Sequence, residues 1–455
     1  MQDKTDSSIQ YFSDWLDSYL NFERTPKKGI FWLDTMRFFT EKLGHPEKSY
    51  RCFHVAGSKG KGSTAQMIAE ILAAAGYKTG LYTSPHSMDF RERIVTTVGF
   101  LSDDVYRTAA DELIAAVAET KADELPGGRS PTWFELVTLF AMLCFKYAQV
   151  DWVVWEVGLG GRLDSTNVVS PDCCCIGPIE LEHTEFLGDT LEKIAAEKAG
   201  IIKDGVPVIV APQQTDSVKD VFRKTAAEHN ALLTFVDEAV TISGIHYTSK
   251  GPCVGMKIRL ASKLFASPLC PTLRLLGTFQ AENAAVAALA VKTLLSNINE
   301  RTIETGLAKA YLPGRFEIVP SVKGYSDIPV MILDGAHTPR SMAFTIRTFN
   351  GLYDGKHDAV LLFACAADKD AEDMATMLKG SFSSVIITRP GETKAADMDR
   401  LGKAFAYADI PYTSIYDYNE AIAFALQTAN KQKKALLVTG SFYLVAEVKK
   451  ALAAL

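Results

Sequence analysis

The sequence predicts an α/β protein of two domains, each built around a sheet of mainly parallel strands. Short β-branched runs alternate with amphipathic helical stretches such as 65–75 and 281–295, which is typical of βα units. The chain has 455 residues, whereas one average domain has ~150. Residues 237–271 break the alternation with short segments and turn residues, so an antiparallel segment is expected there. The expected buried strands are 52–56, 152–157, 173–176, 206–210, 330–333, 360–363, 385–388 and 435–439.

A domain boundary is expected near residues 297–314. An Ala-rich helix ends at Ser296-Asn297, and a second helix covers 300–310. Pro313-Gly314 then breaks this helix before a new series of strands starts. The expected domains are 1–299 and 300–455, and both are within the usual range of domain sizes.

The composition excludes several classes of protein. Hydrophobic residues make up 47% and charged residues 22% of the chain, as in globular proteins and unlike disordered or fibrous ones. The net charge of −6 does not favour binding to nucleic acid or to an anionic membrane. No apolar run reaches the ~18 residues of a membrane span, and the polar start Met1–Asp6 does not resemble a secretion signal. The eight cysteines, with Cys173–Cys175 too close together for a zinc site, favour reduced thiols. We therefore expect a cytoplasmic monomer that acts on small molecules.

A glycine-rich turn between a strand and a helix is the best local signal for function. The strand 52–56 runs into Gly57-Ser58-Lys59-Gly60-Lys61-Gly62-Ser63, and Gly76 ends the helix that follows. Glycines let backbone N–H groups surround an anion, and the helix N-terminus adds partial positive charge. Lys61 would contact the β- and γ-phosphates of a nucleotide, and the Ser63 hydroxyl would bind Mg²⁺. The spacing departs from GxxxxGK[ST], so a flexible turn with solvated lysines is the alternative.

Other polar residues stand in patterns that indicate ligand binding. Glu156 ends an apolar strand directly before the glycine-rich segment 158–161, so its carboxylate can face the Mg²⁺ of a nucleotide. The alternative is an exposed acid at a strand end. His183 taken alone is more typical of a structural histidine. Lys198 lies on the apolar face of its helix, where a lysine extends to solvent, pairs with an acid or is chemically modified. Periodicity does not decide among these.

Several motifs, spread over nearly the whole chain, occur in the order typical of a known family. They are His54–Ser63, Gly80–His86, Arg91–Ile94, Glu156–Asn167, His183–Gly188, Glu197–Ile202, Leu312–Glu317 and Asp334–His337. The chain resembles folylpolyglutamate synthase/dihydrofolate synthase, the folate branch of the Mur ligases. Thr83-Ser84-Pro85-His86 and Arg162-Leu163-Asp164 resemble this branch rather than the cell-wall ligases. The resemblance implies a P-loop ATPase-like, ATP-binding domain at 1–299 and a smaller Rossmann-like glutamate-ligase domain at 300–455.

The resemblance also implies the reaction, an ATP-dependent ligation of L-glutamate to a carboxylate of dihydropteroate or a reduced folate. The γ-phosphoryl group of ATP would give an acyl phosphate, the amine of glutamate would attack it, and ADP and phosphate would leave. Such chemistry depends mainly on positioning and on charge stabilisation. The alternatives are another Mur-type amino-acid ligase, a P-loop ATPase or kinase, and a non-catalytic nucleotide-binding module.

Site residues follow from the same resemblance. Catalytic roles are implied for Lys61, His183, Lys198, Arg315 and His337. ATP binding is implied for Gly57, Ser58, Lys59, Gly60, Lys61, Gly62, Ser63, Gln280, Asn283, Arg315 and Asp334. Two Mg²⁺ ions would be held by Ser63, Ser84, Glu156 and His183, and the substrates by Ser84, Pro85, Arg162, Asp164, His337 and Ser441. Lys198 matches a family lysine that is carbamylated by CO₂, and a requirement for a monovalent cation is left open.

Some positions depart from the family pattern. Ser58-Lys59 stands in place of Thr-Asn, Glu182 in place of Asp, Phe279 in place of His, and Thr338 in place of Asn. None of these departures removes a candidate metal ligand.

Overall fold

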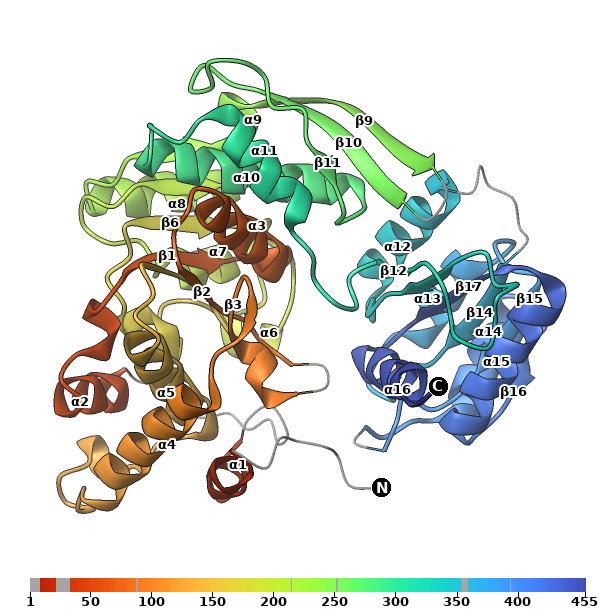
Figure 1. Cartoon of the computed structure of the whole chain (residues 1–455), viewed down its shortest axis with the longest axis horizontal. Helices are drawn as coiled ribbons and strands as arrows, with labels where there is room; N and C mark the ends of the chain where they lie inside the picture. The colour runs from red at the N-terminus through yellow and green to blue at the C-terminus, as the bar shows by residue number, and fades with distance from the viewer. Residues whose placement is uncertain are drawn as a thin grey trace. The chain divides into compact units, whose positions relative to one another are not determined.

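In a computed structural model of the chain, residues 9–21, 33–86, 89–213, 215–250, 253–352, 359–392 and 394–455 are described. They form two compact units, and Figure 1 shows the chain coloured by residue number. Unit 1 comprises Met1–Ser243, Arg259–Pro271 and Ala281–Ala310, and unit 2 comprises Gly244–Ile258, Thr272–Gln280 and Tyr311–Leu455. Each unit contains a large sheet with flanking helices, so the predicted α/β class is confirmed.

Unit 1 is built on an eight-stranded sheet. Its order is β4 (Gly99–Phe100), β3 (Ile94–Thr96), β2 (Thr79–Tyr82), β5 (Trp152–Glu156), β1 (Arg51–Ala56), β6 (Cys173–Ile176), β7 (Val208–Val210) and β8 (Leu233–Phe235). Neighbouring strands from β2 to β8 are parallel, and β3 and β4 add an antiparallel edge. The carboxyl ends of β2, β5, β1 and β6 therefore lie side by side at one edge, where ligands bind in such sheets.

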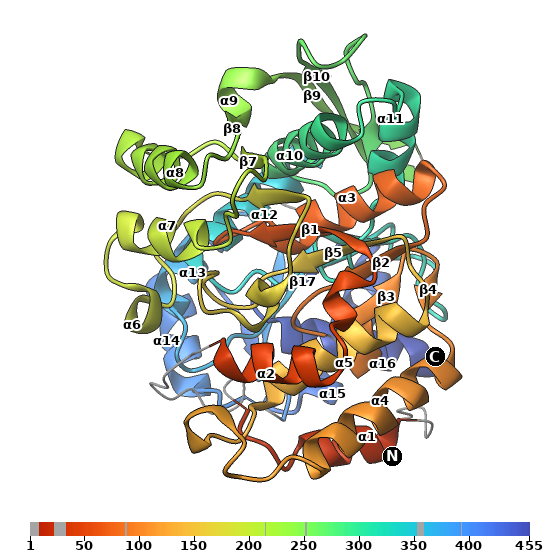
Figure 2. The ribbon, with the colours of Figure 1, turned by 90° about the vertical axis from the view of Figure 1, so that its left-hand side faces the viewer.

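Helices cover both faces of this sheet, as Figure 2 shows for α3 (Lys61–Ala74) and α5 (Trp133–Tyr147). The α3 helix packs along β1, β2 and β5, and α11 (Glu300–Lys309) packs on α3. Since α5 is almost wholly apolar, it is buried against Val153 and Trp155 on the other face. The remaining helices are α1 (Gln10–Leu16), α2 (Asp34–Lys42), α4 (Asp103–Ala118), α6 (Thr184–Leu187), α7 (Leu191–Ala199), α8 (Asp216–Glu228), α9 (Val236–Ala239) and α10 (Thr278–Leu294).

Unit 2 contains a six-stranded sheet. Its order is β12 (Glu317–Val319), β13 (Met331–Leu333), β17 (Ala435–Thr439), β14 (Ala359–Phe363), β15 (Ser384–Ile387) and β16 (Thr413–Ser414). All neighbours are parallel except β12, which pairs antiparallel with β13. The helices are α12 (Pro339–Leu352), α13 (Ala371–Leu378), α14 (Met398–Tyr407), α15 (Tyr418–Gln432) and α16 (Phe442–Ala454). Apolar side chains of α15 and α16 pack on the central strands.

The expected strands are all present, with ends that differ by at most two residues from those predicted. The antiparallel segment is a three-stranded sheet of order β11 (Thr272–Leu273), β10 (Cys253–Ala261) and β9 (Thr241–Lys250), in which β10 and β11 pair antiparallel. The sequence pattern does not predict the short strands β2, β3, β4, β8, β12 and β16. Within the described ranges, no helix is long and apolar enough to cross a lipid bilayer. The division into domains 1–299 and 300–455 stays a prediction.

Candidate functional site

The glycine-rich loop connects β1 with α3 at the carboxyl edge of the unit 1 sheet. Gly57 and Gly60 have φ angles of +146° and +79°, which favour glycine. A Cβ atom on Gly57 would lie 2.9 Å from the backbone of Gly177, and one on Gly60 would lie 2.4 Å from Asn283 Oδ1. The loop therefore packs tightly against the segment after β6 and against α10. Because α3 begins at Lys61, its free N–H groups lie at this loop.

Hydrogen bonds fix the loop to the segment that follows β6. The Ser58 N–H donates to Pro178 O at 3.0 Å. The Ser58 hydroxyl donates to Glu180 O at 3.2 Å and accepts the Glu180 N–H at 3.0 Å. Ser58 is buried, whereas Lys59 and Gly62 of the same loop are partly exposed. The Ser58 side chain thus joins two loops of the protein.

Two lysines converge on the carbonyl oxygen of Gly57. Lys61 Nζ and Lys198 Nζ each donate to it at 3.0 Å, and Lys198 Nζ also lies 3.0 Å from Glu182 Oε1. Lys198 is only 1% exposed. Burial, reinforced by the charge of Lys61 and opposed by Glu182, lowers the pKa of Lys198 to about 8. Of the alternatives open for Lys198, pairing with an acid is the one the structure contains.

Glu182 and His183 lie next to these lysines. Burial opposes ionisation of Glu182, but the charges of Lys61 and Lys198 outweigh it and lower its pKa. Partial burial lowers the pKa of His183, and the two lysines add to this shift against the opposing charge of Glu182. His183 adopts a left-handed conformation, with φ +47°, at the start of α6. A neutral imidazole is the form that binds metal ions.

Glu156 and Ser84 meet at the ends of neighbouring strands. The Ser84 N–H donates to Glu156 Oε2 at 3.1 Å, and Glu156 is buried. Ser63 is buried in the first turn of α3. The four candidate metal ligands therefore lie at or after the carboxyl ends of β2, β5, β1 and β6. Within the part of the chain that the structure describes, no three His, Cys, Asp or Glu side chains cluster around a metal position. A magnesium ion here would need water and phosphate oxygens as further ligands, as Mg²⁺ usually does.

The turn after β5 engages two predicted substrate-binding residues within the protein. Asp164 is buried and accepts hydrogen bonds from Leu159 N–H at 2.9 Å and from Thr166 N–H at 3.0 Å and Oγ1 at 2.5 Å. Burial raises the pKa of Asp164 against the effect of these bonds. Arg162 forms an ion pair of 2.8 Å with Glu197 on α7. The side chains of Asp164 and Arg162 thus both stabilise the turn. Pro85, a third predicted substrate-binding residue, follows Ser84 after β2 through a cis peptide bond.

In unit 2, predicted site residues surround the ring of Phe442. The Arg315 guanidinium lies 4.1 Å and the His337 ring 5.8 Å from the centre of this ring. His337 Nδ1 lies 2.8 Å from Gly335 O. Ser441 caps α16 by accepting the Tyr443 N–H at 3.1 Å. The sequence analysis does not identify Phe442 as a site residue. The feature that could have identified it is its position, an aromatic residue directly after the N-cap of a helix that follows a strand.

Asp334 and Gln280 are also buried in unit 2. Asp334 follows β13 and accepts hydrogen bonds from Phe316 N–H at 2.8 Å, Ala336 N–H at 3.1 Å and Thr345 Oγ1 at 2.6 Å. Burial raises the pKa of Asp334 against these bonds. Gln280 is 1% exposed in the first turn of α10, and its N–H donates to Gly277 O at 2.8 Å.

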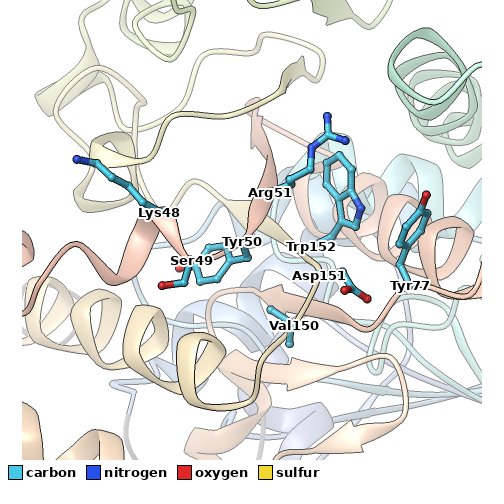
Figure 3. A pocket seen from close by; sticks show the side chains of 8 residues that line it. All are labelled: Lys48, Ser49, Tyr50, Arg51, Tyr77, Val150, Asp151 and Trp152. Carbon is cyan, nitrogen blue, oxygen red and sulfur yellow. The ribbon is translucent and has the colours of Figure 1, made fainter.

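A shallow pocket of about 520 Å³ lies at the opposite, amino edge of the unit 1 sheet (Figure 3). Arg51 stacks on Trp152 at 4.2 Å and forms an ion pair of 2.8 Å with Asp172. Asp151 accepts the Lys78 N–H at 2.7 Å. Because these charged groups already have partners in the protein, we assign no chemistry to this pocket. Its lining residues are Lys48, Ser49, Tyr50, Arg51, Tyr77, Val150, Asp151 and Trp152.

A glycine-rich loop at the carboxyl edge of a parallel sheet, with lysines, hydroxyls and a carboxylate around it, defines a P-loop nucleotide-binding α/β protein. Residues 55–291 match the Mur ligase middle domain, and residues 314–442 match the glutamate ligase domain of Mur ligases. The dihydrofolate synthase/folylpolyglutamate synthase of Bacillus subtilis is 31% identical over 98% of this chain and 99% of its own. The folylpolyglutamate synthase of Lacticaseibacillus casei is 32% identical over 95% of this chain and 96% of its own. An Escherichia coli structure, solved in complex with DHPP and ADP, has a TM-score of 0.80 and 30% identity, covering 97% of this chain and 98% of that chain.

The chain therefore belongs to the Mur ligase family, in its branch of folylpolyglutamate and dihydrofolate synthases. The resemblance noted from the sequence motifs is confirmed, and with it the predicted enzyme class, an ATP-dependent ligase.

Proposed function

We propose that the chain joins L-glutamate to a carboxylate of a pteroyl or folate substrate, while ATP is converted to ADP and phosphate. The observation that carries this proposal is the loop at 57–63, with Lys61, Lys198 and Glu182 beside it and the Glu156–Ser84 pair on the adjacent strands. The names of the relatives and the ADP and DHPP of the Escherichia coli structure support it.

The loop backbone and Lys61 would hold the β- and γ-phosphates. The ammonium groups of Lys61 and Lys198 share one carbonyl acceptor, and the charge of Lys61 contributes to the lowered pKa of Lys198. A phosphate oxygen is a stronger partner for an ammonium group than a neutral carbonyl. We therefore expect Lys61 to leave Gly57 O when a nucleotide binds.

Ser63, Ser84, Glu156 and His183 would hold Mg²⁺, as two ions in our proposal. Bound Mg²⁺ would neutralise the charge of the phosphates and so favour transfer of the γ-phosphoryl group. Hydroxyl and carboxylate oxygens are ligands that Mg²⁺ prefers, and the Ser84 N–H holds one Glu156 oxygen in place. The lowered pKa of His183 keeps its imidazole neutral and able to coordinate.

Lys198 would be carbamylated. Its neutral amine would attack CO₂, with formation of an N–C bond and loss of one proton. The pKa of about 8 increases the neutral fraction over that of an ordinary lysine, and the modification would exchange the ion pair with Glu182 for an anion near the metal site. The intact mass of the protein, measured with and without bicarbonate, tests this step.

Arg315 and His337 would act on the reacting groups. Arg315 is exposed and its guanidinium lies on the ring of Phe442, so its N–H donors can take up charge that develops on the transferring phosphoryl group. His337 and Ser441, on either side of the same ring, would receive the incoming glutamate.

The test supplies ATP, Mg²⁺ and glutamate with dihydropteroate or tetrahydrofolate in parallel, and the products are weighed by mass spectrometry. We expect a product one glutamyl residue heavier, and phosphate release that requires both glutamate and the acceptor. The Bacillus subtilis relative is named for both activities and the Lacticaseibacillus casei relative for folylpolyglutamate synthase alone, and they are 31% and 32% identical to this chain. The proposal therefore includes both acceptors. Phosphate release without either substrate would instead favour an ATPase.

Lys61→Ala should abolish ligation while the protein stays folded. Lys48→Ala is the matched control, because Lys48 is an exposed lysine at the opposite edge of the same sheet. Turnover like that of the wild type in Lys61→Ala would rule out the proposed site.

A further inference from the structure

The turn that carries Arg315 is held on both sides by buried carboxylates. Glu317 Oε2 accepts the Gly314 N–H at 2.7 Å, and Asp334 Oδ2 accepts the Phe316 N–H at 2.8 Å. Arg315 is the residue between these two N–H donors. Glu317 and Asp334 are each 8% exposed, whereas Arg315 is exposed. An exposed cation is thus mounted on a backbone that two buried anions fix.

The backbone of this turn needs such fixing. Gly314 has φ +68°, and Phe316 has φ +48°, a conformation that an aromatic residue rarely adopts. Phe316 is buried, and Gly335 N–H donates to Gly314 O at 2.9 Å. A conformation of this kind persists only where the surrounding structure determines it.

Glu317 is the buried centre of a small, partly buried network. Lys449 Nζ lies 3.0 Å from both carboxylate oxygens, and the Tyr311 hydroxyl donates to Oε1. The guanidinium of Arg274 stacks 4.9 Å over the Tyr311 ring. Burial, reinforced by the hydrogen bond to Glu317, raises the pKa of Tyr311, so the hydroxyl remains a donor. Residues from two segments of unit 2, 311–317 and α16, thus meet at one carboxylate.

We propose that Glu317, held by Lys449 and Tyr311, is a positioning residue for Arg315. This proposal rests on the proposed function, in which Arg315 contacts the transferring phosphoryl group. Glu317 fixes the turn through the Gly314 N–H, and Phe442 then supports the guanidinium at 4.1 Å. The guanidinium is oriented before substrates bind, so less side-chain freedom is lost during the reaction. The alternative is that Glu317 only stabilises unit 2.

A double-mutant cycle separates the two roles. Glu317→Gln keeps the size of the side chain, but the NH₂ group that replaces one carboxylate oxygen cannot accept the hydrogen bonds made at that position, and the charge that pairs with Lys449 is lost. We expect it to lower kcat by roughly 100-fold in the wild-type background, with a smaller change in the KM for ATP. In an Arg315→Ala background the same change should lower kcat by no more than about 2-fold. Equal losses in both backgrounds, or an unchanged kcat of folded Glu317→Gln, would overturn the positioning role.

Milder variants keep the test informative if Glu317→Gln does not fold. Tyr311→Phe and Lys449→Met each remove one partner of Glu317, and each should lower kcat in the wild-type background but not in Arg315→Ala. Lys450→Met is the matched control for Lys449→Met, because Lys450 is adjacent on α16 and pairs with Glu447. It should retain the kcat of the wild type. Losses in both backgrounds would overturn the proposal.

The wild type in the same assay distinguishes a failure of the proposed function from a failure of the positioning role. If it does not ligate glutamate, the proposed function fails. If it ligates glutamate and the losses are equal in the two backgrounds, only the positioning role fails.

Discussion

Mild acid should destabilise unit 1 through a single buried histidine. His54 lies in the middle of β1 and is 0% exposed. Its Nε2 atom lies 2.8 Å from Thr166 Oγ1, while Nδ1 has no hydrogen-bond partner among the described residues. Burial, and secondly the positive charge of Lys203, lowers the pKa of His54 to about 3 from an ordinary value of 6.5.

The direction of the pH dependence follows from which state, folded or unfolded, binds the proton of His54 at the higher pH. The unfolded chain protonates His54 near pH 6.5, and the folded protein near pH 3, so protons favour unfolding between these values. The stability due to a neutral His54 is fully present above pH 6.5 and is lost as pH falls toward 3. The full difference between the two pKa values of His54 corresponds to about 5 kcal/mol of unfolding free energy. At pH 5, about 2 kcal/mol of this free energy is lost.

Urea unfolding between pH 5 and 8, followed by tryptophan fluorescence, measures this loss. The five tryptophans all lie at or before residue 155, so the signal reports on unit 1. His54→Gln keeps an amide near Thr166 but does not titrate. Relative to this variant, the wild type should lose about 2 kcal/mol of unfolding free energy between pH 7 and pH 5. Parallel pH profiles of the wild type and His54→Gln would show that the pKa of His54 does not differ between the folded and unfolded states.

Three further changes have defined outcomes. Gly306→Ala places a methyl group 2.4 Å from Ile71 Cα, where α11 packs on α3, so it should cost about 1–3 kcal/mol; an unchanged midpoint of thermal unfolding would contradict this close packing. Lys198→Met leaves Glu182 without its buried partner and should cost about 3 kcal/mol in urea unfolding at pH 7. Since the pKa of Lys198 falls from 10.5 to about 8, the wild type should gain stability as pH rises from 8 to 10.5, and Lys198→Met should lack that gain. Asp164→Asn leaves one oxygen to accept from Thr166 and places an NH₂ group opposite the Leu159 N–H, so faster hydrogen exchange at that N–H should report the loosened turn.

The central strands were predictable because they are buried on both faces. Such strands appear as continuous apolar runs, as β5 and β17 do, and their ends follow from the glycines and polar residues around them. The short strand β2 contains Gly80, which local propensity disfavours in a strand. A Cβ atom at Gly80 would lie 2.6 Å from the ring of Phe145 on α5. The glycine makes room for a residue 65 positions later, and no local pattern contains that information.

The phosphate loop was predictable because the strand, the glycine-rich turn and the start of the helix are consecutive in the chain. The pairing of Lys198 with Glu182 was not, because the acid lies 16 residues earlier in a different loop. The helical pattern placed Lys198 on an apolar face but could not show which anion shares that face. Only the packing of α7 against the segment after β6 brings the two charges together.

The turn of Arg315 combines a contact between residues close in the sequence with a contact between residues far apart in it. The carboxylate of Glu317 reaches back to an N–H only three residues earlier, so this half of the arrangement is local. The ammonium group that holds Glu317 comes from Lys449, 132 residues later. Lys449 lies on α16, the helix that begins with Phe442, and α16 is docked through Leu444, Val445 and Val448 in the core of unit 2. One helix therefore supplies both the ring beneath the guanidinium and the cation behind the turn. Because Arg315 depends on the docking of α16 through two contacts, a substitution that loosens this helix should reduce turnover before it unfolds the sheet.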